Sequence, residues 1–167
     1  LGVYLGDGGS GKATKKNIIL SMNKEEEKEI LQEFADYVAV NYKIKTHQNY
    51  PAQVCFVPTS ARYNISNTSL LQRFDEMIEL HLPSQQKRMS EAIFNLPLGE
   101  QKYVLQGLFT SDGTVANYGE KSQYVALDSS SLQLLKDVQI LLLGFGIKSK
   151  LYKNRRAGKN ICLWPDG

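Results

Sequence analysis

The 167-residue chain has few of the residues that several common architectures require. It has only two cysteines, Cys55 and Cys162, which cannot build a disulfide framework and which suit a reducing interior. With His47 and His81 they match no zinc-binding spacing. No apolar run approaches the roughly 18 residues of a membrane helix, and no signal-peptide pattern opens the chain. We therefore expect an intracellular protein with no membrane partner, in the cytoplasm or nucleoid, or in an organelle or the nucleus of a eukaryote.

A strong excess of one charge is also missing. The formal net charge is +3, which is weak evidence for a polyanionic partner unless the basic residues cluster. A Gly-rich phosphate-binding loop is not convincing either. Residues 6–12 imitate a P-loop, but no strand precedes them and their spacing is wrong.

Two stretches of the chain share one pattern of small and apolar residues that ends in Asp-Gly. Leu105 to Gly113 reads Leu-Gln-Gly-Leu-Phe-Thr-Ser-Asp-Gly, and Leu1 to Gly8 reads Leu-Gly-Val-Tyr-Leu-Gly-Asp-Gly. Small residues four positions apart share one face of a helix and would let two helices approach closely. These pairs are Gly2 with Gly6 and Gly107 with Ser111.

The Asp-Gly ends predict where both motif helices stop. Gly8 and Gly113 fit the C-terminal cap position, where a left-handed backbone is common. Two helices packed side by side would then present Asp7 and Asp112 together at their adjacent ends. The alternative interpretation is that each Asp-Gly merely ends a helix or forms an ordinary turn.

Matching elements follow the two motifs at the 105-position offset between Asp7 and Asp112. The first motif leads through a small loop at residues 9–11. The first predicted pair is a strand at 18–22 and a strand at 122–128. The second pair is an amphipathic helix at 24–42 and another at 131–144. The third pair is a hairpin of 43–48 with 53–58 and a hairpin of 146–152 with 160–165. Two further helices, 70–80 and 90–95, are predicted only in the first half.

The repeat divides the chain into a first half, residues 1–104, and a shorter second half, residues 105–167. No low-complexity linker separates them, so we predict one pseudo-symmetric domain. The first motif lacks preceding residues and the second half ends early. We therefore expect the chain to be cut from a longer protein at both ends.

Two carboxylates at adjacent helix C-termini are electrostatically unfavourable, because those ends already carry partial negative charge and like charges repel. A divalent cation relieves both problems. Carboxylate and phosphate oxygens suit Mg²⁺, and paired metals about 4 Å apart can activate water and stabilise the leaving oxygen of a phosphodiester. The pattern therefore favours phosphodiester hydrolysis.

Basic and amide side chains gather in and near the two predicted hairpins. Alternate strand residues face one side, Lys and Arg suit phosphates and guanine, and Gln suits adenine. An ordinary solvated strand face is the alternative for either hairpin alone. The candidate DNA-binding residues are Lys12, Lys15, Lys16, Lys43, Lys45, His47, Gln48, Gln53, Lys121, Gln123, Lys148, Lys150, Lys153, Arg155, Arg156 and Lys159.

The Leu105–Gly113 stretch resembles the second LAGLIDADG motif of a homing endonuclease, and Gly2–Gly8 resembles the end of the first. The chain around Ser129–Tyr152 is similar to inteins of ribonucleotide reductases. The resemblance implies an α+β fold, a pseudo-two-fold duplicated αββαββα unit with two saddle-shaped antiparallel sheets over double-stranded DNA. It also implies a monomer with an internal pseudo-dimer.

The same resemblance implies a function and its residues. The motif acids Asp7 and Asp112, with their neighbours Gly6 and Ser111, would hold Mg²⁺ or Mn²⁺ and cut both DNA strands. Intein-borne members carry a catalytic Lys ahead of the second motif, a role that falls on Lys87. Ser90 stands where those members have Pro, which departs from the pattern.

Three hypotheses follow from the resemblance. The first is a site-specific, Mg²⁺-dependent DNA endonuclease. The second is a relative that binds DNA or RNA without cutting, as a degenerate intein domain or a maturase. The third is a structural intein domain with no nucleic-acid role. Leu1 is not a splicing nucleophile and no His-Asn pair ends the chain, so splicing residues are expected outside it.

Overall fold

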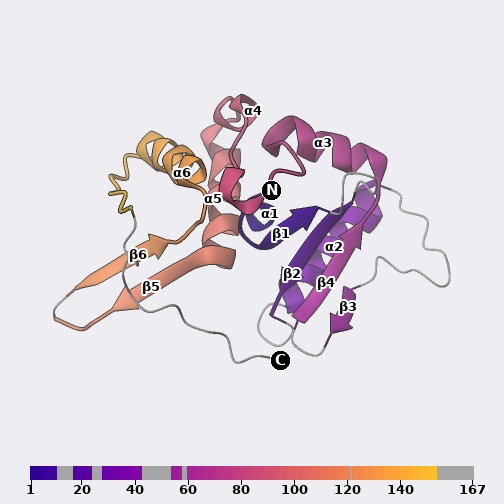
Figure 1. The fold of residues 1–167 in the computed structure, drawn as a ribbon, viewed down its shortest axis with the longest axis horizontal. Coiled ribbons are helices and arrows are strands. Elements are labelled where there is room, and N and C mark those ends of the chain that lie inside the picture. Colours follow the sequence, from indigo (N-terminus) through magenta and orange to yellow (C-terminus); the bar gives the residue numbers. More distant parts are fainter. Residues whose placement is uncertain (11–16, 24–27, 43–53, 58–59, 121, 154–167) are drawn as a thin grey trace.

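The computed structural model describes residues 1–10, 17–23, 28–42, 54–57, 60–120 and 122–153 (Figure 1). A unit of helix, two antiparallel strands and helix occurs twice in these ranges. The first unit consists of α1 (Gly2–Asp7), β1 (Gly8–Ser10), β2 (Ile18–Met22) and α2 (Lys28–Tyr42). The second unit consists of α5 (Leu98–Asp112), β5 (Gly113–Asn117), β6 (Gln123–Leu127) and α6 (Leu132–Gly144). None of the described helices is long and apolar enough to cross a membrane.

The strand registers repeat as well as the element order. The glycine that follows each motif aspartate pairs with a leucine on the next strand, Gly8 with Leu20 and Gly113 with Leu127. This agreement confirms the duplicated α+β fold expected from the sequence. The expected boundary at residues 104 and 105 falls inside α5, and the division into halves stays a prediction.

The first sheet has four antiparallel strands in the order β1-β2-β4-β3, where β3 is Val54–Val57 and β4 is Ser60–Ile65. The sequence analysis missed β4, which lies between β2 and β3 and pairs with both. The two positions between β3 and β4 allow the short connection that antiparallel neighbours permit. The predicted partner of residues 53–58, residues 43–48, lies outside the described residues.

Two other strand predictions need correction. Residues 9–11 were expected to form a loop, but Gly8–Ser10 forms β1. Gly and Ser have little intrinsic strand preference, so pairing with β2 determines this strand. Residues 146–152 were expected to form a strand, but residues 147–153 form neither helix nor strand. A strand needs a ladder partner, and the expected one, residues 160–165, lies outside the described residues.

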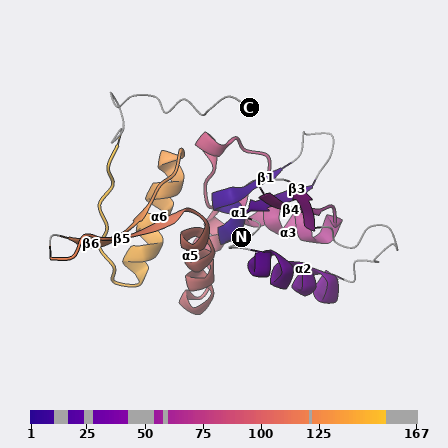
Figure 2. The ribbon, with the colours of Figure 1, turned by 90° about the horizontal axis from the view of Figure 1, so that it is seen from below.

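α3 (Thr68–Ile78), α4 (Glu91–Phe94) and α6 lie along the upper side of the molecule in Figure 1, and the strands run away from that side. α3, the short 3₁₀ turn η1 (Ser84–Gln86) and α4 connect the two units, and both predicted helices of this region are confirmed. α2 lies along one face of the four-stranded sheet (Figure 2), while the β5–β6 ribbon projects from the body.

One buried cluster joins the two units. Fully buried side chains from both units contribute to it, among them Leu5, Ile18, Val38, Leu108 and Leu134. Apolar burial of this kind is the main favourable contribution to folding. The two units therefore share a core, and the motif helices lie at the junction between them.

Candidate active site

The motif helices α1 and α5 pack with their backbones in contact. A Cβ atom at Gly2 would collide with the carbonyl oxygen of Val104 and lie 2.7 Å from the Leu108 nitrogen. A Cβ atom at Gly107 would lie 2.9 Å from the Val3 nitrogen. Carbon contacts are normally about 3.5–4.0 Å, so this approach requires glycine at both positions. The close packing predicted from the small-residue spacing is confirmed.

This packing brings the two acid-bearing helix ends together. Asp7 is the last residue of α1 and is exposed, and Asp112 is the last residue of α5 and is half-buried. A Cβ atom at Gly6 would meet the Ser111 side chain and lie 3.0 Å from Oδ2 of Asp112. The end of α1 therefore lies directly against the end of α5.

The glycines after the two acids are not left-handed caps, contrary to the sequence prediction. Gly8 has φ −78° and ψ 150°, and Gly113 has φ −79° and ψ 148°, both extended. Their N–H groups donate to the carbonyls of Tyr4 and Phe109. A Cβ at Gly8 would lie 2.5 Å from the Tyr4 Cα, and one at Gly113 would collide with the Phe109 carbonyl. Glycine is required here for space, because each helix turns directly into a strand.

Lys87 reaches the acid-bearing end of α1 from the segment between η1 and α4. Its side chain is buried, and its Nζ shares three protons among four main-chain carbonyls at the end of α1. The acceptors are Tyr4 at 3.1 Å, Leu5 at 3.1 Å, Gly6 at 3.0 Å and Gly8 at 2.7 Å. The last carbonyls of a helix have no partner within it, and a cation there also complements the helix dipole. Lys87 thus caps the helix that carries Asp7.

The charges at this site affect one another. Burial lowers the pKa of Lys87, and the carboxylates of Asp112 and Asp7 partly oppose that shift. Burial raises the pKa of Asp112, Lys87 acts in the opposite direction, and Asp128 adds to the increase. Burial is the largest cause in both cases, so this is a partly dehydrated acid–base cluster rather than a solvated ion pair.

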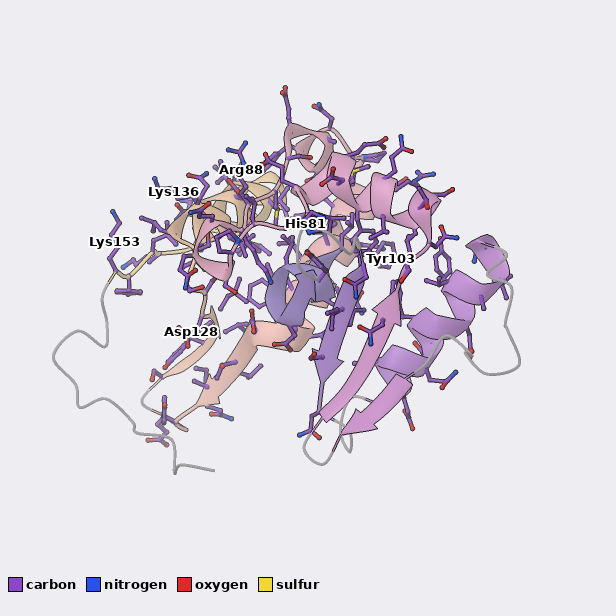
Figure 3. All side chains as sticks on the ribbon, turned by 45° about the vertical axis from the view of Figure 1, so that its right-hand side comes forward. His81, Arg88, Tyr103, Asp128, Lys136 and Lys153 are labelled. Carbon is purple, nitrogen blue, oxygen red and sulfur yellow. The ribbon has the colours of Figure 1, made fainter. Side chains whose placement is uncertain are left out.

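The second unit holds the main chain on both sides of Arg88. The Ser131 hydroxyl donates to the Lys87 carbonyl at 2.6 Å, and the Met89 N–H donates to Oδ2 of Asp137 at 2.9 Å. Ser131 and Asp137 are both buried. Arg88, between these contacts, points to the surface (Figure 3), where its Nε lies 3.4 Å from Glu79.

Four of the predicted DNA-binding residues lie in the described part of the chain. Gln123 begins β6, and Lys148, Lys150 and Lys153 follow α6; all four are exposed, and Lys153 projects from the body in Figure 3. The other twelve lie outside the described residues, namely Lys12, Lys15, Lys16, Lys43, Lys45, His47, Gln48, Gln53, Lys121, Arg155, Arg156 and Lys159.

Three polar residues at the site were missed by the sequence analysis. Asp128 follows β6 (Figure 3) and influences Asp112 through its charge. Ser131 precedes an apolar helix and accepts from the Leu134 N–H at 3.2 Å, so its sequence position does identify it as an N-cap. Its contact with Lys87, and that of Asp137 with Met89, join residues more than 40 positions apart. No local pattern reports such contacts.

Comparison with known proteins agrees with this geometry. Residues 99–163 match the family model of the LAGLIDADG-like domain. This match covers almost all of the second helix–strand–strand–helix unit. The structure of the chain is similar to one titled as mesophilic variants of the homing endonuclease I-DmoI, with a TM-score of 0.62 and 18% identity over 94% of this chain and 75% of that one. The fold is therefore that of a LAGLIDADG homing endonuclease-like domain.

Two kinds of curated relative match nearly the whole chain. It is 32% identical over its full length to the ribonucleoside-diphosphate reductase NrdEB subunit alpha of Bacillus subtilis and of Bacillus phage SPbeta. It is 24% identical, over 93% of its length, to the ATP-dependent DNA helicase Hel308 of Methanocaldococcus jannaschii. The chain spans only 16% of the reductases and 12% of the helicase.

The oxygen atoms at the motif helix ends suit a divalent cation. One aspartate stands at each of the two adjoining helix ends. Hard cations such as Mg²⁺ prefer a few carboxylates supplemented by substrate and water oxygens. Within the described ranges, no group of three His, Cys, Asp or Glu side chains is placed to hold a metal. The Ser111 hydroxyl donates to the Gly107 carbonyl at 3.2 Å, and Lys87 binds the Gly6 carbonyl. The carboxylates of Asp7 and Asp112 therefore remain the principal candidate ligands.

Proposed function

We propose that this LAGLIDADG-like domain is a site-specific endonuclease that cuts both strands of DNA with the help of a divalent cation. The observation that carries the proposal is the meeting of two aspartates at the ends of two helices whose backbones touch. Such a pair is costly without a counter-charge. A phosphodiester, a cation and two carboxylates form a mutually compensating set of charges.

Asp7 and Asp112 are the proposed ligands of Mg²⁺ or Mn²⁺, with Gly6 and Ser111 completing the surroundings. When bound, the cation would supply Lewis-acid stabilisation of the developing charge on the phosphate. Asp112 is the more dehydrated acid, since burial raises its pKa. Lys87 contributes positive charge beside both acids and keeps the end of α1 in place through its four carbonyl contacts. We retain Lys87 as the proposed charge-stabilising residue near the scissile phosphate.

The proposed partner is a double-stranded DNA with a long target site, bound by a monomer that contains its own pseudo-dimer. The β5–β6 ribbon offers Gln123 for base contacts, and Lys148, Lys150 and Lys153 offer charge for phosphates. The same ribbon exposes 78% of Val115 and 64% of Val125, which are cross-strand partners. Contact with thymine methyl groups would account for so exposed an apolar pair.

We also infer that the domain belongs to an inserted, intein-type element. A reductase and a helicase have unrelated activities by name, yet each matches this chain over almost its whole length and over only a small part of its own. A segment shared in this way is independent of its host's activity. The splicing part of such an element would lie outside these residues.

The proposal is tested with the full-length protein that contains this domain. The substrate is a supercoiled plasmid carrying the uninterrupted ribonucleotide reductase gene of the same organism, beside a plasmid with the insertion region scrambled. We expect Mg²⁺-dependent linear product from the first plasmid alone, and none with EDTA. Tight, salt-sensitive binding without cutting would support the cleavage-inactive relative instead. Absence of both binding and cutting would support a structural intein domain.

A further inference from the structure

The buried Ser131 hydroxyl makes two hydrogen bonds, one within its own helix and one to the segment that carries Lys87. The hydroxyl accepts from the Leu134 N–H at 3.2 Å, which caps α6, and donates to the Lys87 carbonyl at 2.6 Å. The residue is 0% exposed, so the hydroxyl has no access to water as an alternative partner. One oxygen thus links the start of a second-unit helix to the main chain that carries Lys87.

Asp137 holds the same segment two residues further on. Its Oδ2 accepts from the Met89 N–H at 2.9 Å, and its Oδ1 accepts from the Gln133 side chain at 2.8 Å. The side chain is only 5% exposed. A buried carboxylate is unfavourable unless it is hydrogen-bonded, and here it uses one oxygen for the Lys87 segment and the other for its own helix.

The main chain and the side-chain Nζ of Lys87 are consequently held by different units of the molecule. Its main chain is bound by α6, and its Nζ is bound by the carbonyls of α1. A lysine side chain is long and flexible, and ordering it has a substantial entropic cost. Two fixed anchors on the main chain reduce the volume that the Nζ atom can explore.

We propose that Ser131 and Asp137 are positioning residues of the cleavage site, which fix the Lys87 segment so that Nζ stays at the acid-bearing end of α1. This role rests on the proposed endonuclease function. Through Lys87 they couple α6 of the second unit to Asp7 of the first. A displacement of about 1 Å in a catalytic group can lower a rate by roughly a hundredfold, so loss of either anchor acts on the rate rather than on DNA binding.

The first test compares Ser131→Ala with Asn67→Ala in the full-length protein on the target plasmid. Asn67 is the matched control, because its side chain caps α3 by accepting from the Leu70 N–H at 3.0 Å, away from Lys87. At a temperature where circular dichroism shows all variants folded, we expect Ser131→Ala to lower kcat about ten- to hundredfold with KM unchanged. Asn67→Ala should keep the wild-type kcat, and Ser131→Thr, which retains the hydroxyl, should restore most of it.

Asp137 is tested in the same way with Asp137→Ala and Asp137→Asn. The alanine removes both acceptors, while the asparagine keeps one oxygen for the Met89 N–H. We expect a loss of kcat in the first variant that is largely recovered in the second. Equal kcat in wild type, Ser131→Ala and Asp137→Ala would overturn the proposal. An equal loss in Asn67→Ala would also overturn it, because the effect would then follow stability alone.

A second measurement needs no nuclease activity. The urea midpoint is measured for Ser131→Ala, Lys87→Met and the double variant, and again with Asn67→Ala in place of Ser131→Ala. If Ser131 acts through Lys87, the first pair gives a combined shift smaller than the sum, and the control pair adds. Additive shifts in both pairs would refute the link. If the wild type cuts no plasmid, the endonuclease proposal fails, and this cycle still decides whether Ser131 positions Lys87.

Discussion

The contact between α1 and α5 gives the sharpest structural prediction. Gly107→Ala places a methyl group 2.9 Å from the Val3 nitrogen and 3.2 Å from the Gly2 Cα, both of them main-chain atoms. Normal contact distances are about 3.5–4.0 Å, so the helices must separate by several tenths of an ångström. Overpacking of this kind costs typically about 1–3 kcal/mol, which outweighs the gain of up to about 1 kcal/mol in helix propensity.

Gly99→Ala is the matched control for this variant. Gly99 lies in the same helix, and a Cβ there meets nothing within 4 Å. That variant should be as stable as the wild type or slightly more so, by up to about 1 kcal/mol. For a chain of this size, each kcal/mol shifts Tm by about 2–4 °C. Thermal and urea unfolding of both variants give the comparison.

Gly107→Ala should also lower cleavage, because the separation moves Asp112 relative to Asp7. A Gly107→Ala variant at least as stable as Gly99→Ala would refute the claim that the helix backbones touch. A less stable variant with wild-type cleavage would show that the spacing of the two acids does not control the reaction.

Three further predictions concern the charged groups. Asp112→Asn should bind target DNA normally and be more stable than the wild type at neutral pH. Burial raises the pKa of Asp112 in the folded state, so the wild type loses stability as pH rises from the unfolded-state pKa to the folded-state pKa. The advantage of the variant should therefore vanish below about pH 4, near the unfolded-state pKa. An advantage that grows on acidification would contradict this sign. Lys87→Met should reduce the free energy of unfolding by about 1–3 kcal/mol, since the carbonyls at the end of α1 lose the Lys87 ammonium as a donor. The same variant should abolish plasmid cleavage. Unchanged urea unfolding would argue against the cap. Lys148→Ala should weaken DNA binding equally for specific and scrambled sites. If Lys148 contacts one phosphate, the slope of log binding constant against log salt concentration should fall in magnitude by about 1. An unchanged slope in a fluorescence titration would show that Lys148 lies outside the interface.

The sequence predicted those parts of the fold that repeat or that depend on local periodicity. The small-residue spacing at Gly2 and Gly107 correctly indicated a close helix pair, and the 105-position offset indicated matching units. Amphipathic spacing located α2, α3 and α6 within a few residues of their ends. These signals are local, so a single sequence carries them.

The errors came from features that only tertiary structure determines. β1 contains Gly-Gly-Ser and exists because β2 pairs with it, and β4 lies between β2 and β3 despite its polar residues. Gly8 and Gly113 were identified as important, but for the wrong reason: both need space beside the preceding turn rather than a left-handed backbone.

The site was predicted only in part for the same reason. The spacing of the motifs identified Asp7 and Asp112, and the resemblance identified Lys87. The contacts that hold Lys87 join α1, the segment before α4 and the N-terminal half of α6. Because these residues are far apart in sequence, neither periodicity nor a motif could have revealed that Ser131 and Asp137 bind that segment.

Strand cleavage by the two aspartate variants shows whether Asp7 and Asp112 act as one metal-dependent site. The full-length wild type, Asp7→Asn and Asp112→Asn are each incubated with the target plasmid and Mg²⁺, and supercoiled, nicked and linear DNA are separated on a gel. If the two carboxylates form one metal-dependent site, the wild type yields linear DNA, and each variant binds the target but yields none. Linear product from either variant at the wild-type rate, or wild-type cleavage that persists in EDTA, would contradict the account.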